Sequence, residues 1–404
     1  MKSEYSIYHD EAFHDRKVTS KGKTYMNIEN KDSSSYFYLI HLGFKNNEID
    51  KYTSQYLQLE SSYKKKLGLC DEQELKGDIL KKRWFRYGIK TMNKEQVDFY
   101  TNYMKLIDKD VIISISIINQ FELVFKNVFR GINTMILGHK EGSKMYYAFS
   151  KFLYLNKSEE LLNLLFDIEN NKVAIKQEIK SIANSVIIRN KEIAHKFTET
   201  PIAEQLLQFI ENEEDICNDE KYDMDYAWSF QGISLLLDEL EISKKVCELY
   251  IDGEEGFEKI IEMLQSKYYI VDGLDSKKSI GNRMSDMFIR LISAIIHSLE
   301  DQLINVGKTN KKEKHDLSEE WFKLTEKQYD LYIVIADIFN QREYIKGTLH
   351  ISISSDAAFI FFMLLNYFVS FKDFNEYQKV SASEHANYFI GNSLIAFSKL
   401  LDDI

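Results

Sequence analysis

The segment Asp110–Ile118 (DVIISISII) constrains the fold of this chain more than any other stretch. Its apolar residues form an almost continuous run instead of alternating with polar ones, and a strand of this kind is buried on both faces. Such a strand belongs in the middle of a sheet that helices cover on both sides. The chain also contains a single proline and 16 glycines among its 404 residues, which indicates few turns and many helices. We therefore expect an α/β fold.

Other segments predict further strands. These are Ser6–Phe13 (SIYHDEAF), residues 21–28 (KGKTYMNI), Ser34–Phe44 and Lys244–Phe257, the last of which ends in several carboxylates. The expected order is three strands close together near the N-terminus, followed by strands that are separated by helices. This order is typical of an RNase H-like mixed sheet, with other α/β folds as alternatives. A short strand and an amphipathic helix are expected within Tyr268–Leu303.

Helical periodicity dominates the rest of the chain, beginning at residues 47–66 and continuing at 74–88, and suggests its division into parts. The acidic segment 211–225 is expected to be a loop. Residues 1–122 and 241–305 would form a discontinuous RNase H-like core, and residues 123–240 a large helical insertion. A basic linker follows at residues 308–315, and residues 316–404 read as a C-terminal helical region. The apolar stripe of that last region predicts either core packing or an interface to another copy or another protein.

Composition excludes several classes of protein. A formal charge of −11 does not fit a protein that coats nucleic acid uniformly, although a nuclease can be acidic when its carboxylates cluster in a site. Three cysteines without a CxxC spacing predict neither a zinc knuckle nor a disulfide framework. The apolar run 357–369 is too short to cross a bilayer and is expected to be a buried helix. With no apolar leader at the N-terminus, we expect a cytoplasmic protein that does not bind membranes.

Four carboxylates lie at the ends of expected strands or near the starts of expected helices. Asp10 and Asp252 lie at strand ends, Glu74 at the start of a helical stretch, and Asp286 early in an amphipathic helix. Taken singly, an acid at such a place is typical of a turn or a helix cap. Taken together, they could hold Mg²⁺ or Mn²⁺, because these hard cations prefer oxygen ligands. Two such ions about 4 Å apart would activate water and stabilise the leaving oxygen of a phosphodiester.

The motifs around these acids resemble those of an uncharacterised RNase H-like family of prokaryotic proteins. The matching stretches are HDEAF with Asp10, ELKGDIL with Glu74, YIDGEE with Asp252, and VDGLDSKKSIGNRMSDM with Asp286. They occur in the family's order across residues 1–120 and 244–300. The resemblance implies a metal-dependent nuclease with these four acids as ligands. Ala12-Phe13, Lys76 and Arg283 depart from the family pattern.

A second motif lies inside the helical block. The segment Ile187–Phe197 (IIRNKEIAHKF) resembles the Arg-Asn-x4-His signature of HEPN ribonucleases, in the sequence variant found in abortive-infection proteins. The resemblance implies metal-independent cleavage, with His195 as acid or base and Arg189 on the phosphate. On one ideal helix Arg189 and His195 would lie about 120° apart, so the helix must end between them or a partner must supply one of them. The alternative is an ordinary helix C-terminus rich in cations.

Basic residues near the predicted site are candidate contacts for a nucleic-acid backbone. The candidates are Lys81, Lys82, Arg83, Arg86, Lys277, Lys278 and Arg283. For the first four, a solvated helix face with Trp84 and Phe85 turned inward is the alternative.

Three hypotheses for function follow. The first is a metal-dependent nuclease of RNA or DNA in anti-phage defence, where members of both resembled families occur as toxins. The second is a metal-independent HEPN ribonuclease. The third is a catalytically inactive binding or assembly component of a defence system. Nucleic acid is the expected partner, and a homo-oligomer or a partner protein remains open.

Overall fold

The protein is described by a computed structural model that covers most of the chain. The described residues are 2–12, 36–70, 75, 85–119, 121–122, 125, 140–165, 168–193, 196, 199–212, 229–252, 258–274, 279–306, 312–340, 347–352 and 355–403.

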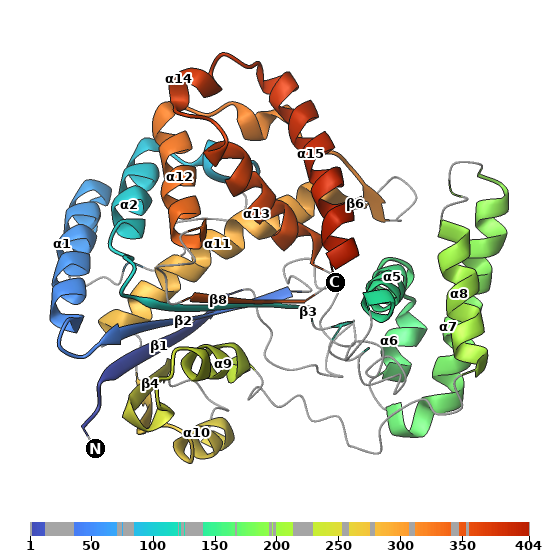
Figure 1. Cartoon of the computed structure of the whole chain (residues 1–404), viewed down its shortest axis with the longest axis horizontal. Helices are drawn as coiled ribbons and strands as arrows, with labels where there is room; N and C mark the ends of the chain where they lie inside the picture. Colours follow the sequence, from blue (N-terminus) through green and yellow to red (C-terminus); the bar gives the residue numbers. More distant parts are fainter. Residues whose placement is uncertain are drawn as a thin grey trace.

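A mixed β-sheet runs through the middle of this structure (Figure 1). Its strands are β1 (Tyr5–Ala12), β2 (Tyr36–Lys45), β3 (Ile112–Asn119), β4 (Cys247–Asp252), β5 (Ile270–Leu274) and β8 (Gly347–Ile351). Within the described residues the strand order is β5-β4-β1-β2-β3-β8. β2 is antiparallel to β1 and β3, whereas β4 is parallel to β1, β5 to β4, and β8 to β3. The α/β class predicted from the sequence is confirmed.

β3 is buried along its whole length, as its continuous apolar sequence predicts. Alternate residues enter two separate cores: Ile113 and Ile115 contribute to one, Ile112 and Ile118 to the other. This division follows from the two-residue period of a strand. The sheet is therefore the middle layer between two sets of helices.

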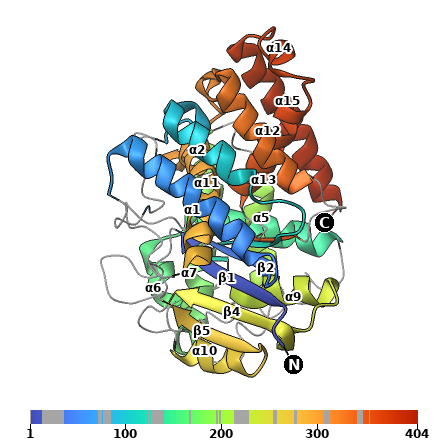
Figure 2. The same ribbon diagram turned by 90° about the vertical axis from the view of Figure 1, so that its left-hand side faces the viewer.

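The two helical layers differ greatly in size (Figures 1 and 2). The larger contains α1 (Ile49–Leu67), α2 (Lys94–Met104), α11 (Ile280–Leu303), α12 (Glu326–Asn340) and α13 (Asp356–Val369). The opposite face carries the shorter helices α9 (Gln231–Glu239) and α10 (Glu258–Gln265). Short 3-10 turns are η4 (Gly88–Thr91), η7 (Lys244–Val246) and η8 (Glu319–Phe322), and β6 (Ile304–Val306) pairs with β7 (Lys312–Lys314) in a separate ribbon.

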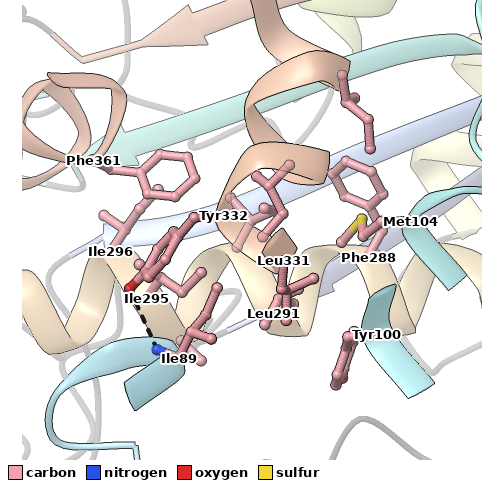
Figure 3. Packing of buried hydrophobic residues seen from close by; sticks show 14 of the residues in the cluster. Ile89, Tyr100, Met104, Phe288, Leu291, Ile295, Ile296, Leu331, Tyr332 and Phe361 are labelled. Atoms are coloured by element: carbon pink, nitrogen blue, oxygen red, sulfur yellow. Dashed lines mark hydrogen bonds between the residues drawn. The ribbon is translucent and has the colours of Figure 1, made fainter. Parts of the chain in front are cut away.

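α11 is the central element of the larger layer. Apolar residues on most sides of it are buried, because it lies between the sheet and the outer helices. Figure 3 shows Leu291 and Ile295 of α11 packed with Leu331 and Tyr332 of α12. The Tyr332 hydroxyl also accepts a hydrogen bond from the backbone N–H of Ile89 at 3.4 Å. The position of α11 over the sheet is therefore fixed by packing from both sides.

The helical block between β3 and β4 has its own core. It comprises α5 (Lys140–Asn156), α6 (Glu159–Leu165), α7 (Ile168–Lys191) and α8 (Thr200–Asn212). Polar contacts from α5 join it to the rest: Lys151 Nζ lies 2.9 Å from Asp356 Oδ2, and the Tyr147 hydroxyl donates to Asp356 Oδ1 at 3.0 Å. The Tyr154 hydroxyl donates to Glu300 of α11 at 3.5 Å.

The C-terminal region differs from its expected all-helical character. It contains α12, α13, α14 (Phe374–Tyr377) and α15 (Ala382–Asp403), but also β8, which extends the sheet beside β3. β8 has five residues, and so short a run gives no period that distinguishes strand from helix. The pairing with the buried strand β3 decides its conformation. α12 and α13 bury their apolar faces in the same core as α11.

Other expectations about local structure have mixed outcomes. The helix expected over residues 47–66 is α1, and the apolar run 357–369 is the buried helix α13. The strand expected at residues 21–28, most of the helical stretch 74–88 and most of the acidic segment 211–225 lie outside the described residues. Among the described helices, none is long and apolar enough to span a bilayer.

Candidate active site

Asp10 lies near the end of β1 on the side of the sheet that faces α11. Tyr8 and Ala12, two residues before and after it, belong to the core on that side, whereas Ile7 belongs to the opposite core. Because successive side chains on a strand point to opposite faces, Asp10 shares the face of Tyr8 and Ala12. Its side chain is only partly buried, so it lies at the rim of that core.

The backbone of β4 places Asp252 beside Asp10. β1 and β4 pair in parallel with Tyr8 opposite Tyr250, and the rings of these tyrosines stack with centroids 5.0 Å apart. Two residues further along the two strands stand Asp10 and Asp252. Neighbouring strands lie about 4.8 Å apart, so the register brings both positions to one edge of the sheet. The Asp252 side chain itself lies outside the described part.

Hydrogen bonds hold the start of α11 against β1. Asn282 Nδ2 donates to the carbonyl of His9 at 3.0 Å, and the Ser285 hydroxyl donates to the carbonyl of Tyr8 at 3.1 Å. The helix approaches this closely because Gly281 has no side chain: a Cβ there would lie 2.4 Å from carbon atoms of the Tyr8 ring. These contacts position the next turn of α11, which carries Asp286, above the end of β1.

Asp10 and Asp286 lie close enough for the charge of one to alter the ionisation of the other. Burial, and then the negative charge of Asp286, raises the pKa of Asp10 well above its usual range. Two groups act in the opposite direction: the Glu11 N–H, which donates to Asp10 Oδ1 at 2.7 Å, and the guanidinium of Arg290. Arg290 Nε donates to Asp286 Oδ1 at 3.2 Å. Two acids predicted from distant motifs therefore meet in one place.

Two buried tyrosines of α2 lie behind this pair. The Tyr103 hydroxyl donates to the carbonyl of Met284 on α11. Burial raises the pKa of Tyr103 well above its usual range, with smaller contributions from other tyrosines and from Asp286 and Asp10. Burial and then Asp286 act on Tyr100 in the same direction. No sequence motif marks Tyr100 and Tyr103, and their three-residue spacing indicates only a buried helix face.

The donor set fits a hard divalent cation in its chemistry. Mg²⁺ commonly takes one or two protein carboxylates together with water and substrate phosphate oxygens, and Asp10 and Asp286 provide two. In the part of the chain that the structure describes, no three His, Cys, Asp or Glu side chains gather closely enough to hold a metal. The third and fourth predicted ligands, Glu74 and the Asp252 side chain, lie outside this part of the chain.

The adjacent acids Asp10 and Glu11 point to opposite faces of the sheet. Glu11 is buried on the α9 side, where its Oε2 lies 3.6 Å from His9 Nε2. The rings of His9 and His41, which face each other across β1 and β2, are 4.7 Å apart, and Phe230 packs against both. Burial and then His9 lower the pKa of His41 well below its usual range. Glu11 and His9 are thus separated from the Asp10 site by the sheet.

Arg283 has an internal partner instead of a place on the nucleic-acid surface. Its Nη1 donates to both carboxylate oxygens of Glu60 on α1, at 2.9 and 2.8 Å. Glu60 is buried, and Lys64 Nζ lies 3.5 Å from it. A buried carboxylate requires such a counter-charge, so we do not include Arg283 in the proposed nucleic-acid surface. The sequence did not reveal this, because Glu60 and Arg283 are joined only by tertiary contact.

The other predicted basic contacts are only partly described. Arg86 is exposed, and its guanidinium lies 5.3 Å from the centre of the Tyr87 ring. An exposed cation beside a half-buried aromatic ring suits a contact with a nucleotide. The remaining candidates lie outside the described residues: Lys81, Lys82, Arg83, Lys277 and Lys278.

The Arg-Asn-x4-His motif spans the end of a helix. α7 ends at Lys191, between Arg189 and His195, which removes the fixed 120° separation of a continuous helix. The Arg189 guanidinium lies 3.5 Å from Glu199 Oε2, and Lys196 Nζ lies 2.8 Å from Glu199 Oε1. Asn190 is buried and its Nδ2 has no hydrogen-bond partner among the described residues. His195 lies outside the described residues.

Comparison of the chain with family models, with curated proteins and with solved structures gives no significant match.

Proposed function

We propose that the chain is a metal-dependent nuclease with an RNase H-like fold. The observation that carries the proposal is the meeting of Asp10 and Asp286, from β1 and from the helix after β5, at the edge where β4 ends in Asp252. The strand order β5-β4-β1-β2-β3 among the described residues, with β2 antiparallel to β1 and β3, supports such a sheet. Its third antiparallel strand is β3, the segment that the sequence predicted as a later strand separated by helices. β8 and the helices between β2 and β3 would be additions to it.

The residues of the site have distinct roles in this proposal. Asp10 and Asp286, with Asp252 and Glu74 completing the set, would hold Mg²⁺ or Mn²⁺, which supplies Lewis-acid stabilisation of the phosphate and a nucleophilic water. The contacts of Gly281, Asn282 and Ser285 with β1 keep the two described carboxylates in place before the substrate arrives. The resulting preorganisation removes a reorganisation cost from the reaction.

The substrate class follows from the chemistry of the donors and from the resemblance described above. A site of this kind acts on phosphodiesters, and we propose RNA or DNA as substrate, with anti-phage defence as the biological setting. Arg86, exposed beside Tyr87, is the described residue best placed among the basic candidates to contact a nucleotide. We keep the remaining basic candidates as predictions.

Cleavage assays with carboxamide variants test this function. We expect Asp10→Asn and Asp286→Asn to lower Mn²⁺-dependent cleavage of RNA or DNA by about 100-fold or more, because the charges that hold the cation are lost. EDTA should have the same effect on the wild-type protein. Asp301→Asn is the matched control, since Asp301 lies on the same helix with its side chain 59% exposed and away from β1. Cleavage that persists in EDTA and in both site variants would exclude the proposal.

A metal-independent HEPN ribonuclease is the second candidate, and the end of α7 between Arg189 and His195 is the observation that favours it. In that case cleavage would continue in EDTA and would be lost in His195→Ala and Arg189→Ala. Glu199→Gln should then increase cleavage, because it releases Arg189 from its carboxylate partner.

An inactive assembly component is the remaining hypothesis. It predicts normal defence in cells when Asp10, Asp286, Arg189 and His195 are all replaced.

A further inference from the structure

Arg290 contacts one of the two described carboxylates of the proposed active site, Asp286, although neither motif includes it. Its Nε donates to Asp286 Oδ1 at 3.2 Å, one helical turn away on α11. The side chains of Arg290 and Asp286 are 36% and 22% exposed, so the pair lies at the rim of the core and not free in solvent. A guanidinium carries five N–H donors, and the contact with Asp286 uses only one of them.

A simple explanation would be an ordinary salt bridge along a helix. Acid and base four residues apart are common, and an exposed pair contributes only about 0.5 kcal/mol or less. Two observations distinguish Arg290 from such a pair. The hydrogen bonds of Asn282 and Ser285 place this part of α11 directly over β1. Asp286, the hydrogen-bond partner of Arg290, is also one of the carboxylates proposed to hold the cation, so the pair belongs to the site itself.

The electrostatic situation explains what a cationic side chain does here. Asp10 and Asp286 repel each other when both are ionised, and burial strengthens the repulsion. A positive charge beside Asp286 offsets part of this repulsion in the absence of a cation. A divalent cation bound to the same oxygens would repel the guanidinium, since the two positive charges would compete for one place.

We propose that Arg290 is a positioning residue that takes the place of the metal in the cation-free protein and is displaced from Asp286 when a divalent cation binds. This inference rests on the proposed function, because it assumes that Asp10 and Asp286 hold the cation. After displacement, the planar guanidinium is available to a phosphate oxygen of the substrate, the group that arginine binds best. Arg290 thereby keeps the carboxylates assembled and prevents them from binding the cation more tightly than the reaction requires.

Binding of Mn²⁺ to the intact chain, measured by calorimetry at about pH 8, tests the competition without any cleavage assay. We expect Arg290→Gln to lower the Mn²⁺ dissociation constant by about fivefold, because the competing charge is gone. The same variant should melt at a lower temperature than the wild-type protein in EDTA and should gain more thermal stability from saturating Mn²⁺. Arg290→Lys retains the charge and should bind Mn²⁺ with nearly wild-type affinity, and it keeps the test valid if the glutamine variant does not fold.

Lys323→Gln provides the matched control. Lys323 Nζ lies 2.7 and 2.6 Å from carboxylate oxygens of Glu319 and Glu320, so it too is a cation paired with acids, but it follows η8 directly and its side chain is 42% exposed. Its substitution should leave the Mn²⁺ dissociation constant unchanged.

Three results would overturn the inference, and they separate it from the proposed function. If Asp10→Asn and Asp286→Asn bind Mn²⁺ as the wild type does, both the proposed function and the inference fail. If those variants lose Mn²⁺ binding while Arg290→Gln binds with wild-type affinity, only the inference fails and Arg290 is a structural residue. Weaker Mn²⁺ binding by Arg290→Gln would also overturn it, because Arg290 would then assist the cation instead of competing with it.

Discussion

Gly281 of α11 lies directly against the ring of Tyr8 in β1, at a distance that leaves no room for a Cβ. This contact lets α11 approach the sheet closely enough for Asn282 and Ser285 to bond the strand's carbonyl groups. The relative position of Asp10 and Asp286 therefore depends on a residue with no chemistry of its own.

We expect Gly281→Ala to destabilise the protein by about 1–3 kcal/mol, because the added methyl group must displace the Tyr8 ring or the helix. Urea unfolding would measure this change. Gly391→Ala on α15 is the control: a Cβ there meets open space, so the substitution should be neutral or stabilising by up to about 1 kcal/mol. Equal effects of the two substitutions would show that the contact with Tyr8 does not control stability.

Replacement of Asp10 by Asn should stabilise the fold while it removes the proposed activity. The folded-state pKa of Asp10 lies above its unfolded value, so the ionised carboxylate opposes folding, and this cost is present at pH values above the folded pKa. We expect Asp10→Asn to raise the free energy of unfolding by about 1 kcal/mol at neutral pH in EDTA. The gain should shrink as pH falls towards the unfolded pKa of about 4. A loss of stability at neutral pH would contradict this prediction.

The buried His41 predicts a loss of stability in mild acid. Its folded-state pKa is lowered, so the unfolded chain binds a proton more readily than the folded one. The contribution of neutral His41 is complete above the unfolded pKa of about 6.5 and is lost as pH falls below it. We expect His41→Phe to reduce the pH dependence of the melting temperature between about pH 6.5 and pH 5. His315, which is exposed, is the control position.

The buried ion pair between Arg283 and Glu60 should be more important for stability than for substrate binding. Arg283→Met leaves the Glu60 carboxylate with Lys64 at 3.5 Å as its described cation, and we expect a loss of about 2–3 kcal/mol. Addition of Glu60→Leu should recover part of this loss, because the unpaired charge is removed. If Arg283→Met kept wild-type stability and bound nucleic acid more weakly, Arg283 would instead belong to the nucleic-acid surface.

Much of the fold follows from local patterns. The apolar run of β3 predicts a strand buried on both faces, and the periodicity of α1 and the apolar run of α13 predict their helices. These patterns report burial and period, which each segment carries by itself. β8 carries no such signal, because five residues are too few and its pairing with β3 comes from a distant part of the chain.

The candidate site likewise has residues that the sequence predicted and contacts that it could not predict. Asp10, Asp252 and Asp286 were candidate ligands because they lie at the ends of expected strands or near the start of an expected helix. The four-residue spacing of Asp286 and Arg290 could also be read on that expected helix. The partner of Arg283 was not readable, because Glu60 lies on another helix and only packing brings the two together.

The amino-acid sequence alone determined the class of fold, the burial of β3 and the types of residue that stand where strands end. Tertiary structure alone decided which distant residues meet: Asp10 with Asp286, and Arg283 with Glu60. The physical reason is the separation along the chain over which each effect acts. Periodicity and turn preferences act between neighbours in the chain, whereas charges interact through space once packing has brought distant segments together.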